Sequence, residues 1–290
     1  MKELPAPTFH LSHSFLASSA SFLGIPHIDW GVQQPARSPA GQPRGGGITA
    51  VWAEHLDEVR AAQRLRFNVF AREMGARLET PANAAYPEHD IDLFDDYCEH
   101  LLVRDKATQQ VVGTYRVLTP AQAKRIGTTY TDTEFDLTRL RSMRERMVEL
   151  GRSCVHRDYR HGGVIMALGG ALFEFMRRNR FEAMFGCASI PMAHQHTAHG
   201  AAAVSIWNQL RATHLAPIEH QVFPRRPLPL HQLDADLAVE PPALVKGYLR
   251  LGAKVLGPPA WDPKFNTADL PIMARLEELP GRYRKRFLGA

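Results

Sequence analysis

Hydrophobic residues recur with two different periods from residue 48 onward, and these periods predict alternating strands and helices. Residues 48–53 form a short run that is typical of a strand. The next apolar positions are spaced as on one face of a helix of about four turns. These positions are Leu56, Val59, Ala62, Leu65, Val69 and Phe70.

Further along the chain, short apolar runs bounded by turn residues predict strands, and longer periodic runs predict helices. The expected strands are residues 101–103, 111–118, 147–156, 181–190 and 268–276, and the first two form a hairpin. The expected helices are residues 164–178 and 201–212, and residues 244–255 are expected to form a helix that leads into a strand. This order predicts an α/β protein with a mixed central sheet flanked by helices.

The composition is that of a soluble globular chain. Of the 290 residues, 44% are hydrophobic and 22% are charged, and no apolar run reaches the ~18 residues that span a bilayer. The three cysteines, Cys98, Cys154 and Cys187, form no CxxC pair. Their spacing excludes a disulfide scaffold or zinc ribbon and favours a cytoplasmic location.

The formal charge of +5 favours an acidic partner. A carrier protein, an anionic membrane face and a phosphate-bearing cofactor all fit this charge. Nucleic acid is not expected as a partner, because the chain carries no RRM, KH or C2H2 zinc-finger signature.

Residues 1–47 are expected to form a disordered N-terminal arm, because Pro, Ser, Gly and His dominate its composition. The mildly apolar segment 15–23 follows a single lysine and leads to no clear cleavage site, so no secretion signal is predicted. Residues 48–290 are expected to form one domain with a C-terminal extension that completes its sheet.

The most informative stretch is residues 149–165, where a predicted strand runs into a basic, glycine-bearing turn that opens a predicted helix. Unpaired N–H groups at a helix start attract anions, and glycine lets a phosphate approach the backbone. Arg160 and His161 add charge and hydrogen-bond donors. The alternative interpretation is a strand-to-helix connection that uses glycine only for its geometry.

Residues 159–165 resemble the loop that binds the acyl donor in the GCN5-related N-acyltransferases (GNAT). That loop has the form Arg/Gln-x-x-Gly-x-Gly/Ala, and Arg160 and Gly163 match its first two marked positions. Ile165 departs from the third, which relaxes the expectation of acetyl-CoA as donor. The resemblance implies a GNAT fold and the following residues around the donor's phosphopantetheine: Val155, Arg160, His161, Gly162, Gly163 and Ile165.

Four further motifs narrow the branch of this fold. They have the forms Arg-x-x-Val-Phe at residues 66–70, Asp-x-Phe-Asp at 92–95, Gly-x-x-Arg at 113–116 and Glu-x-x-Arg at 149–152. In this order they resemble the acyl-homoserine lactone synthases, which take their acyl chain from acyl carrier protein.

The match is stronger to a sister branch, the L-ornithine Nα-acyl-ACP acyltransferases of ornithine-lipid biosynthesis. That branch carries Glu-x-Gly-Arg-Ser-Cys-Val, found at residues 149–155, and resembles residues 246–254 and 261–269. The resemblance implies transfer of a 3-hydroxyacyl group from acyl carrier protein to the α-amine of L-ornithine, giving lyso-ornithine lipid. No cofactor is implied beyond the 4′-phosphopantetheine arm of the carrier. The alternatives are acyl-homoserine lactone synthesis, transfer to another amino acid and a non-enzymatic, membrane-active protein.

The resemblance also implies catalytic residues. Glu149 is the first choice for the group that accepts the proton of the attacking amine, and Arg152 belongs to the same catalytic motif. The alternative is that Glu149 and Arg152 form a structural ion pair. Ser153 is expected to contact substrate, and alternation along the strand predicts Cys154 on the face opposite Glu149 and Ser153.

Four charged residues are candidates for binding the acceptor amino acid. Asp92 and Asp95 suit cationic groups, although an Asp-rich stretch also suits a turn or helix cap. Arg66 and Arg116 are predicted either to hold the carboxylate of ornithine or to pair with those aspartates, because a guanidinium binds a carboxylate through two donors.

Three other groups of residues carry weaker signals. His194, His196 and His199 lack the spacing of a metal site, so no metal is predicted. Basic residues gather at two helix ends: Arg177, Arg178 and Arg180, and Arg282, Arg284, Lys285 and Arg286. They are interpreted either as helix-end and solvated charges, or as a docking surface for acyl carrier protein or for the anionic inner face of the membrane.

Overall fold

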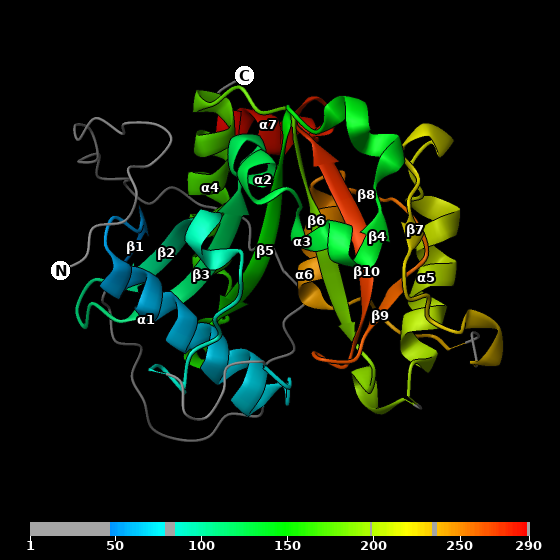
Figure 1. Cartoon of the computed structure of the whole chain (residues 1–290), viewed down its shortest axis with the longest axis horizontal. Helices are drawn as coiled ribbons and strands as arrows, with labels where there is room; N and C mark the ends of the chain where they lie inside the picture. Colours follow the sequence, from blue (N-terminus) through cyan, green and yellow to red (C-terminus); the bar gives the residue numbers. More distant parts are fainter. Residues whose placement is uncertain (1–46, 79–84, 198, 234–236, 289–290) are drawn as a thin grey trace.

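The computed structural model describes residues 47–78, 85–197, 199–233 and 237–288 (Figure 1). The predicted N-terminal arm, residues 1–47, therefore lies outside the described residues except for Gly47.

One mixed sheet forms the centre of the protein, with the strand order β1-β2-β3-β5-β6-β10-β8 and β9 paired to β10. All its pairs are antiparallel except β5 with β6, which is parallel. The predicted mixed sheet is thus confirmed, and the C-terminal strand β10 pairs with β6 along its whole length. The strands are β1 Ile48–Trp52, β2 Glu99–Asp105, β3 Val111–Leu118, β5 Met147–Val155, β6 Ala183–Pro191, β8 Lys254–Val255, β9 Ala260–Asp262 and β10 Thr267–Arg275. Outside this sheet, β4 Phe135–Asp136 pairs with β7 Phe223–Pro224.

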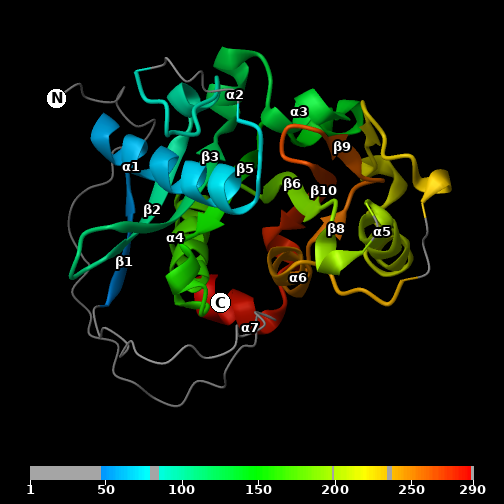
Figure 2. The ribbon, with the colours of Figure 1, turned by 90° about the horizontal axis from the view of Figure 1, so that it is seen from below.

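Helices cover both faces of the sheet. Figure 2 shows α1 (Leu56–Phe67) and α4 (Gly163–Arg178) on opposite faces of the strands β1, β2, β3 and β5. The predicted helix 56–70 is observed as α1 followed by a π-helical turn, Asn68–Glu73. The other helices are α2 Pro120–Ile126, α3 Tyr130–Glu134, α5 Ala201–Thr213, α6 Ala243–Arg250 and α7 Gly281–Leu288.

Strands β5 and β6 separate after a short paired segment. They pair only over Met147–Glu149 and Ala183–Phe185, and Figure 1 shows them diverging beyond that point. Gly186 lies at the divergence, where a Cβ atom would come within 2.3 Å of the carbonyl oxygen of Leu150. Glycine is therefore required there, because a side chain would collide with the neighbouring backbone.

A β-bulge interrupts the pairing of β3 with β5. Thr114 faces Cys154 and Arg116 faces Gly151, so the one residue between them on β3 faces two residues, Arg152 and Ser153, on β5. Arg152 has a positive φ of 52°, which non-glycine residues rarely adopt. The bulge therefore re-aims the side chains of the most informative segment of the sequence.

Ser153 and Cys154 lie on opposite faces of the sheet as predicted, but the predicted position of both relative to Glu149 is wrong because of this bulge. Cys154 packs in the cluster under α1, whereas Ser153 lines a pocket beside α4. The register places Glu149 and Cys154 on the same face as Arg116, with Ser153 on the other. The extra residue shifts the alternation by one position, as a one-residue slip does.

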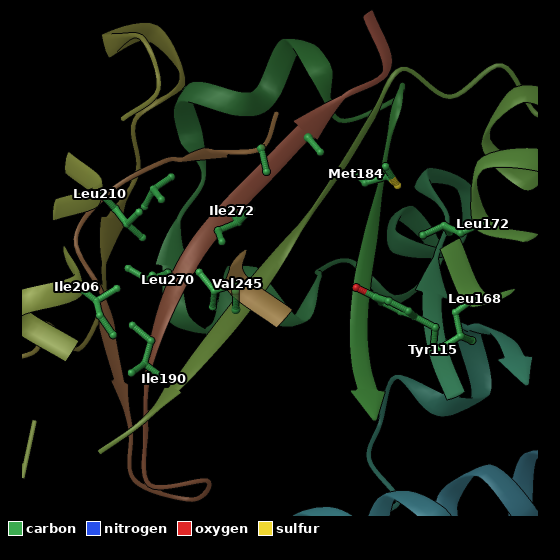
Figure 3. Packing of buried hydrophobic residues seen from close by; sticks show 14 of the residues in the cluster. Tyr115, Leu168, Leu172, Met184, Ile190, Ile206, Leu210, Val245, Leu270 and Ile272 are labelled. Carbon is green, nitrogen blue, oxygen red and sulfur yellow. The ribbon is translucent and has the colours of Figure 1, made fainter. Parts of the chain in front are cut away.

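The main hydrophobic core lies on the α4 face of the sheet and spans both sides of the divergence. Figure 3 shows Leu168, Leu172 and Met184 on one side, and Ile190, Leu270 and the α5 and α6 side chains on the other. Burial on both sides holds the separated strands in place without direct pairing between them.

Candidate active site

Buried arginine–aspartate contacts connect α1 to the loop before β2. The Arg66 side chain is fully buried. Its Nε donates a hydrogen bond to Asp90 Oδ2 at 2.8 Å. Its Nη1 and Nη2 donate to the two carboxylate oxygens of Asp95, at 2.8 and 2.9 Å. Gln63 donates a further hydrogen bond to Asp95 at 3.1 Å. This bidentate geometry is the strong form of an arginine–carboxylate pair.

Two more arginines complete the network from the sheet. Arg116 Nη1, on β3, donates to Asp92 at 2.5 Å and to Asp95 at 3.1 Å. Arg152 Nη2, on β5, donates to Asp92 at 2.9 Å, and its Nε lies 3.2 Å from Asp90. Three arginines and three aspartates therefore form one buried network.

The electrostatics of the network lower the pKa of two of its aspartates, Asp92 and Asp95. Burial alone would raise the pKa of Asp95, but Arg66 and Arg116 hold it well below its usual range. Likewise, Arg116 and Arg152 hold the pKa of Asp92 below its usual value despite its burial. Of the two roles predicted for Arg66 and Arg116, the structure shows pairing with the aspartates.

The predicted roles of Asp92 and Asp95 in acceptor binding stay predictions. The structure shows that arginines already occupy these carboxylates. Asp90 belongs to the same network but was not singled out in the sequence, because it lies outside the Asp-x-Phe-Asp motif.

Glu149 lies 5% exposed on β5, close to the point where β5 and β6 separate. Its carboxylate oxygens accept the backbone N–H groups of Tyr130 at 2.9 Å and Thr131 at 2.6 Å, at the start of α3. It forms no ion pair with Arg152, so the alternative role as that residue's structural partner is wrong. Burial raises the pKa of Glu149 although these N–H groups oppose the shift.

Arg152 and two aromatic rings lie on the same side of the sheet as Glu149. The Arg152 guanidinium carbon is 4.8 Å from the centre of the Tyr130 ring and 4.7 Å from that of Phe265. Cation–π contacts of this length attract a guanidinium. Together with the two aspartate contacts, they fix Arg152 beside the first turn of α3.

The predicted donor loop forms a tight turn that leads directly into α4. Gly162 has a φ of 96°, and α4 begins at Gly163 with no side-chain cap on its first N–H groups. The Arg160 side chain donates to the backbone oxygen of Val155 at 3.0 Å and to Glu73 at 2.8 Å. His161 is exposed beside the loop. Because no side chain caps them, the first N–H groups of α4 are available to a ligand at this end.

An apolar pocket extends from the divergence of β5 and β6 along α4. It encloses about 990 Å³ of empty space, part of it open to solvent, and Ile165, Leu168 and Leu172 of α4 line it together with residues of β6, α6 and α7. Ser153, Tyr115 and Tyr248 bring hydroxyl groups to the same pocket. The hydroxyl groups of Tyr115 and Tyr248 are hydrogen-bonded to each other.

The remaining candidates lie elsewhere. The ring of His194 is hydrogen-bonded to the backbone oxygen of Glu240 at 2.8 Å, and the His196 side chain lies outside the described residues. Sequence reasoning missed Glu134 and Asp269, which lie with Cys187 on the Glu149 side of the sheet. These two carboxylates are 135 residues apart, and no local spacing signals their proximity.

Comparison with known proteins identifies the family. Residues 65–169 match the acetyltransferase (GNAT) domain family. The L-ornithine N(alpha)-acyltransferase of Brucella abortus (strain 2308) is 37% identical over 256 residues, which cover 83% of this chain and 88% of that protein. The chain belongs to the L-ornithine N(alpha)-acyltransferase family. A second member, from Rhodobacter capsulatus, is 34% identical over 80% of this chain and 92% of its own.

Family membership confirms the resemblance found in the motifs, the GNAT fold and the prediction of an acyltransferase. Among solved structures, a CoA-dependent acyl-homoserine lactone synthase is 15% identical with a TM-score of 0.47, covering 84% of this chain and 89% of its own. In the part of the chain that the structure describes, no helix is long and apolar enough to cross a membrane.

Proposed function

We propose that the protein transfers a 3-hydroxyacyl group from acyl carrier protein to the α-amine of L-ornithine, giving lyso-ornithine lipid. The observation that carries this proposal is the 37% identity to an L-ornithine N(alpha)-acyltransferase over 83% of the chain. The geometry supports it, because an apolar pocket begins where the parallel strands β5 and β6 separate, beside the buried carboxylate of Glu149.

The donor is proposed to enter at the start of α4. The phosphate of the phosphopantetheine arm binds the N–H groups of Gly163 and its neighbours, beside Arg160 and His161. The thioester then lies at the bulge of β5, and the acyl chain fills the apolar pocket. The hydroxyl groups of Ser153, Tyr115 and Tyr248 support a chain with a 3-hydroxyl group, since they lie in an otherwise apolar lining.

The proposed reaction needs one proton acceptor and one donor of hydrogen bonds. The neutral amine attacks the thioester carbonyl carbon, the C–N bond forms, and the C–S bond then breaks. Glu149 takes the proton that the nitrogen loses, directly or through one water, and then returns it by the same route to the departing thiolate, which leaves as the free thiol. The bulge leaves backbone groups of β5 outside the ladder, where an N–H can stabilise the developing oxyanion.

Arg152 is proposed to orient the acceptor. Its Nε and Nη2 face Asp90 and Asp92, while its Nη1 makes no hydrogen bond to any described residue. A guanidinium donor without a protein partner suits the α-carboxylate of an amino acid. In this scheme Asp92 holds Arg152 in position instead of touching the acceptor directly.

The exposed basic residues of α7 are proposed to contact an anionic membrane. Helix α4 has 16 residues, so its ends lie about 24 Å apart at 1.5 Å per residue. Helix α7 packs near the far end of α4, through stacked rings of Phe173 and Phe287 at 4.7 Å. Its exposed basic residues thus lie away from the donor loop, where the carrier must deliver its arm: Arg282, Arg284, Lys285 and Arg286.

A vesicle assay tests the membrane contact. Vesicles with anionic lipid should sediment the protein, whereas neutral vesicles should not, and reversing the charges of Arg282 and Arg286 should abolish the difference. Equal sedimentation with both kinds of vesicle would contradict the proposal.

The experiment for the main function measures release of free carrier thiol from 3-hydroxyacyl-ACP. L-ornithine, L-lysine, glycine and S-adenosylmethionine are compared as acceptors, with acyl-CoA as the donor control. Thiol release that requires ornithine and the carrier, with an acyl-ornithine of the expected mass, is the expected result. Release with S-adenosylmethionine, or none with any acceptor, would refute the proposed function.

A further inference from the structure

A second acidic group lies on the same sheet face as Glu149 and has no role in the reaction described above. Glu134 ends α3, and Asp269 lies on β10. The ligand atoms of Glu134, Asp269 and Cys187 all lie within 4.8 Å of one another. Asp262, on β9, is close enough to act on both carboxylates electrostatically.

Three oxygen atoms of this group make no hydrogen bond of good geometry to a described residue, although Glu134, Asp269 and Thr267 lie close enough to interact with one another. They are Asp269 Oδ1, Glu134 Oε2 and the hydroxyl oxygen of Thr267. Asp269 is 3% exposed and Thr267 is 2% exposed, so water cannot freely satisfy them. Buried polar atoms are rarely left unpaired in native proteins, and an exception calls for a ligand or another explanation.

The group also lacks a compensating cation. No lysine, arginine or histidine of the described chain forms an ion pair with Glu134 or Asp269, in contrast to the two arginines that pair with Asp95. Burial, together with the neighbouring carboxylates, raises the pKa of both Glu134 and Asp269. The site is therefore electrostatically complementary to a positive charge that the chain itself does not supply.

The position of the group relates it to the reacting centre. The first turn of α3 binds Glu149, and the last residue of the same helix is Glu134. Between them, the Cys187 thiol lies 3.8 Å from the Thr131 hydroxyl, and Cys187 also lines the acyl pocket. Glu149 and the two carboxylates therefore lie at opposite ends of α3.

We propose that Glu134 and Asp269 bind the side-chain ammonium of the acceptor amino acid and keep it protonated, so that only the α-amine is acylated. The inference rests on the proposed function. An ammonium group has three N–H donors, and they match the three unpartnered oxygens of Glu134, Asp269 and Thr267. A bound ammonium between carboxylates loses its proton less readily, and without a lone pair it cannot attack the thioester.

The three ligand atoms also have the spacing of a cation site, but the chemistry of Cys187 disfavours a metal. Burial and the neighbouring carboxylates raise the pKa of its thiol well above the usual range. Only a thiolate is a good metal ligand. A metal at this group would therefore have to displace the proton of the Cys187 thiol.

The test compares L-ornithine with L-norvaline, which has the same carbon chain without the side-chain amine. With 3-hydroxyacyl-ACP as donor, Glu134→Gln and Asp269→Asn should each lower kcat/KM for ornithine roughly 10- to 100-fold. The value for norvaline should change less than about 3-fold. Glu219→Gln, at an exposed position in the segment Ile218–His220, is the matched control and should leave both values unchanged.

Calorimetric binding of the two amino acids to the wild type and to the variants makes the test independent of turnover. If the wild type binds both equally, or if neither variant changes the ornithine-to-norvaline ratio, the inference is wrong even where ornithine is acylated. Failure of the wild type to acylate ornithine would instead refute the proposed function.

Two further readouts separate ligand binding from other roles. The midpoint of thermal unfolding of Glu134→Gln and Asp269→Asn should stay the same or rise without ligand, because both substitutions remove an uncompensated buried acid; a structural role would lower it. Elemental analysis should find no bound divalent metal. One equivalent of metal in the wild type and none in Asp269→Asn would overturn the proposal in favour of a metal site.

Discussion

Replacing Asp95 by Asn should damage the stability of the protein more than its affinity for the acceptor. The Asp95 carboxylate accepts two hydrogen bonds from Arg66, at 2.8 and 2.9 Å, and one from Arg116 at 3.1 Å. It also accepts one from Gln63 at 3.1 Å and one from the N–H of Asp92 at 3.0 Å. An asparagine has no negative charge, and its amide group would place N–H donors against other donors.

The size of the effect follows from the burial of these groups. Arg66 is fully buried and Arg116 is 4% exposed, so neither guanidinium can turn to water. Removing one partner of a buried ion pair costs about 3–5 kcal/mol, against a total stability of about 5–15 kcal/mol. For a domain of this size, the midpoint of thermal unfolding should fall by roughly 6–20 °C.

Thermal and urea unfolding of Asp95→Asn and of the neighbouring Asp96→Asn measures the effect. Asp96 is exposed, so its replacement should change the free energy of unfolding by less than about 0.5 kcal/mol. If Asp95→Asn lowers the free energy of unfolding by less than about 1 kcal/mol and raises the KM for ornithine, this reasoning is refuted and Asp95 binds the acceptor.

The pH dependence of stability gives a second check on the same residue. The folded protein holds the pKa of Asp95 well below its usual range, because Arg66 and Arg116 outweigh the effect of burial. The unfolded chain therefore binds a proton at higher pH than the folded one. The contribution of Asp95 is fully present above the ordinary pKa of about 4 and is lost as the pH falls below it. Urea unfolding between about pH 3 and 6 should show this slope in the wild type and a flatter one in Asp95→Asn.

Three further substitutions test the proposed reaction. Glu149→Gln should lower kcat roughly 10²- to 10⁴-fold and remove the acidic limb of the pH–rate profile; an unchanged profile would exclude Glu149 as the base. Tyr248→Phe removes the partner of the Tyr115 hydroxyl and should lower kcat/KM for 3-hydroxyacyl-ACP about tenfold relative to unsubstituted acyl-ACP. An equal effect on both donors would contradict hydroxyl recognition. Gly186→Ala places a Cβ within 2.3 Å of the Leu150 carbonyl oxygen. It should lower the free energy of unfolding by about 1–3 kcal/mol, as thermal unfolding measures, and slow acyl transfer in the thiol assay. An unfolding midpoint equal to that of the wild type would show that β6 can shift.

Elements with long periodic runs could be predicted from the sequence, whereas short capped helices were missed. The predicted strand 147–156 and helix 164–178 correspond to β5 and α4 within one residue. Helix α2 has a signal that could have found it: Thr119 caps it, Pro120 opens it and Gly127 ends it with a φ of 84°. Periodicity over seven residues is too short to reveal such a helix.

The contacts of the site depended on information that no single segment contains. The donor loop is contiguous in sequence, so its motif alone placed Arg160 and Gly163 at the start of α4. The bulge at Arg152 arises from the register of β5 against β3, and a strand's own sequence does not state its register. For this reason the sequence predicted the wrong faces for Ser153 and Cys154 relative to Glu149.

Two buried acidic groups lie near β5, and their partners determine what each can do. In the group that the motif revealed, arginines from α1, β3 and β5 occupy the oxygens of Asp92 and Asp95. A cationic acceptor would have to displace those arginines and leave them buried without partners, which is costly. The group of Glu134 and Asp269 keeps unpartnered oxygens and no cation of its own among the described residues. A positively charged acceptor therefore gains most by binding at Glu134 and Asp269.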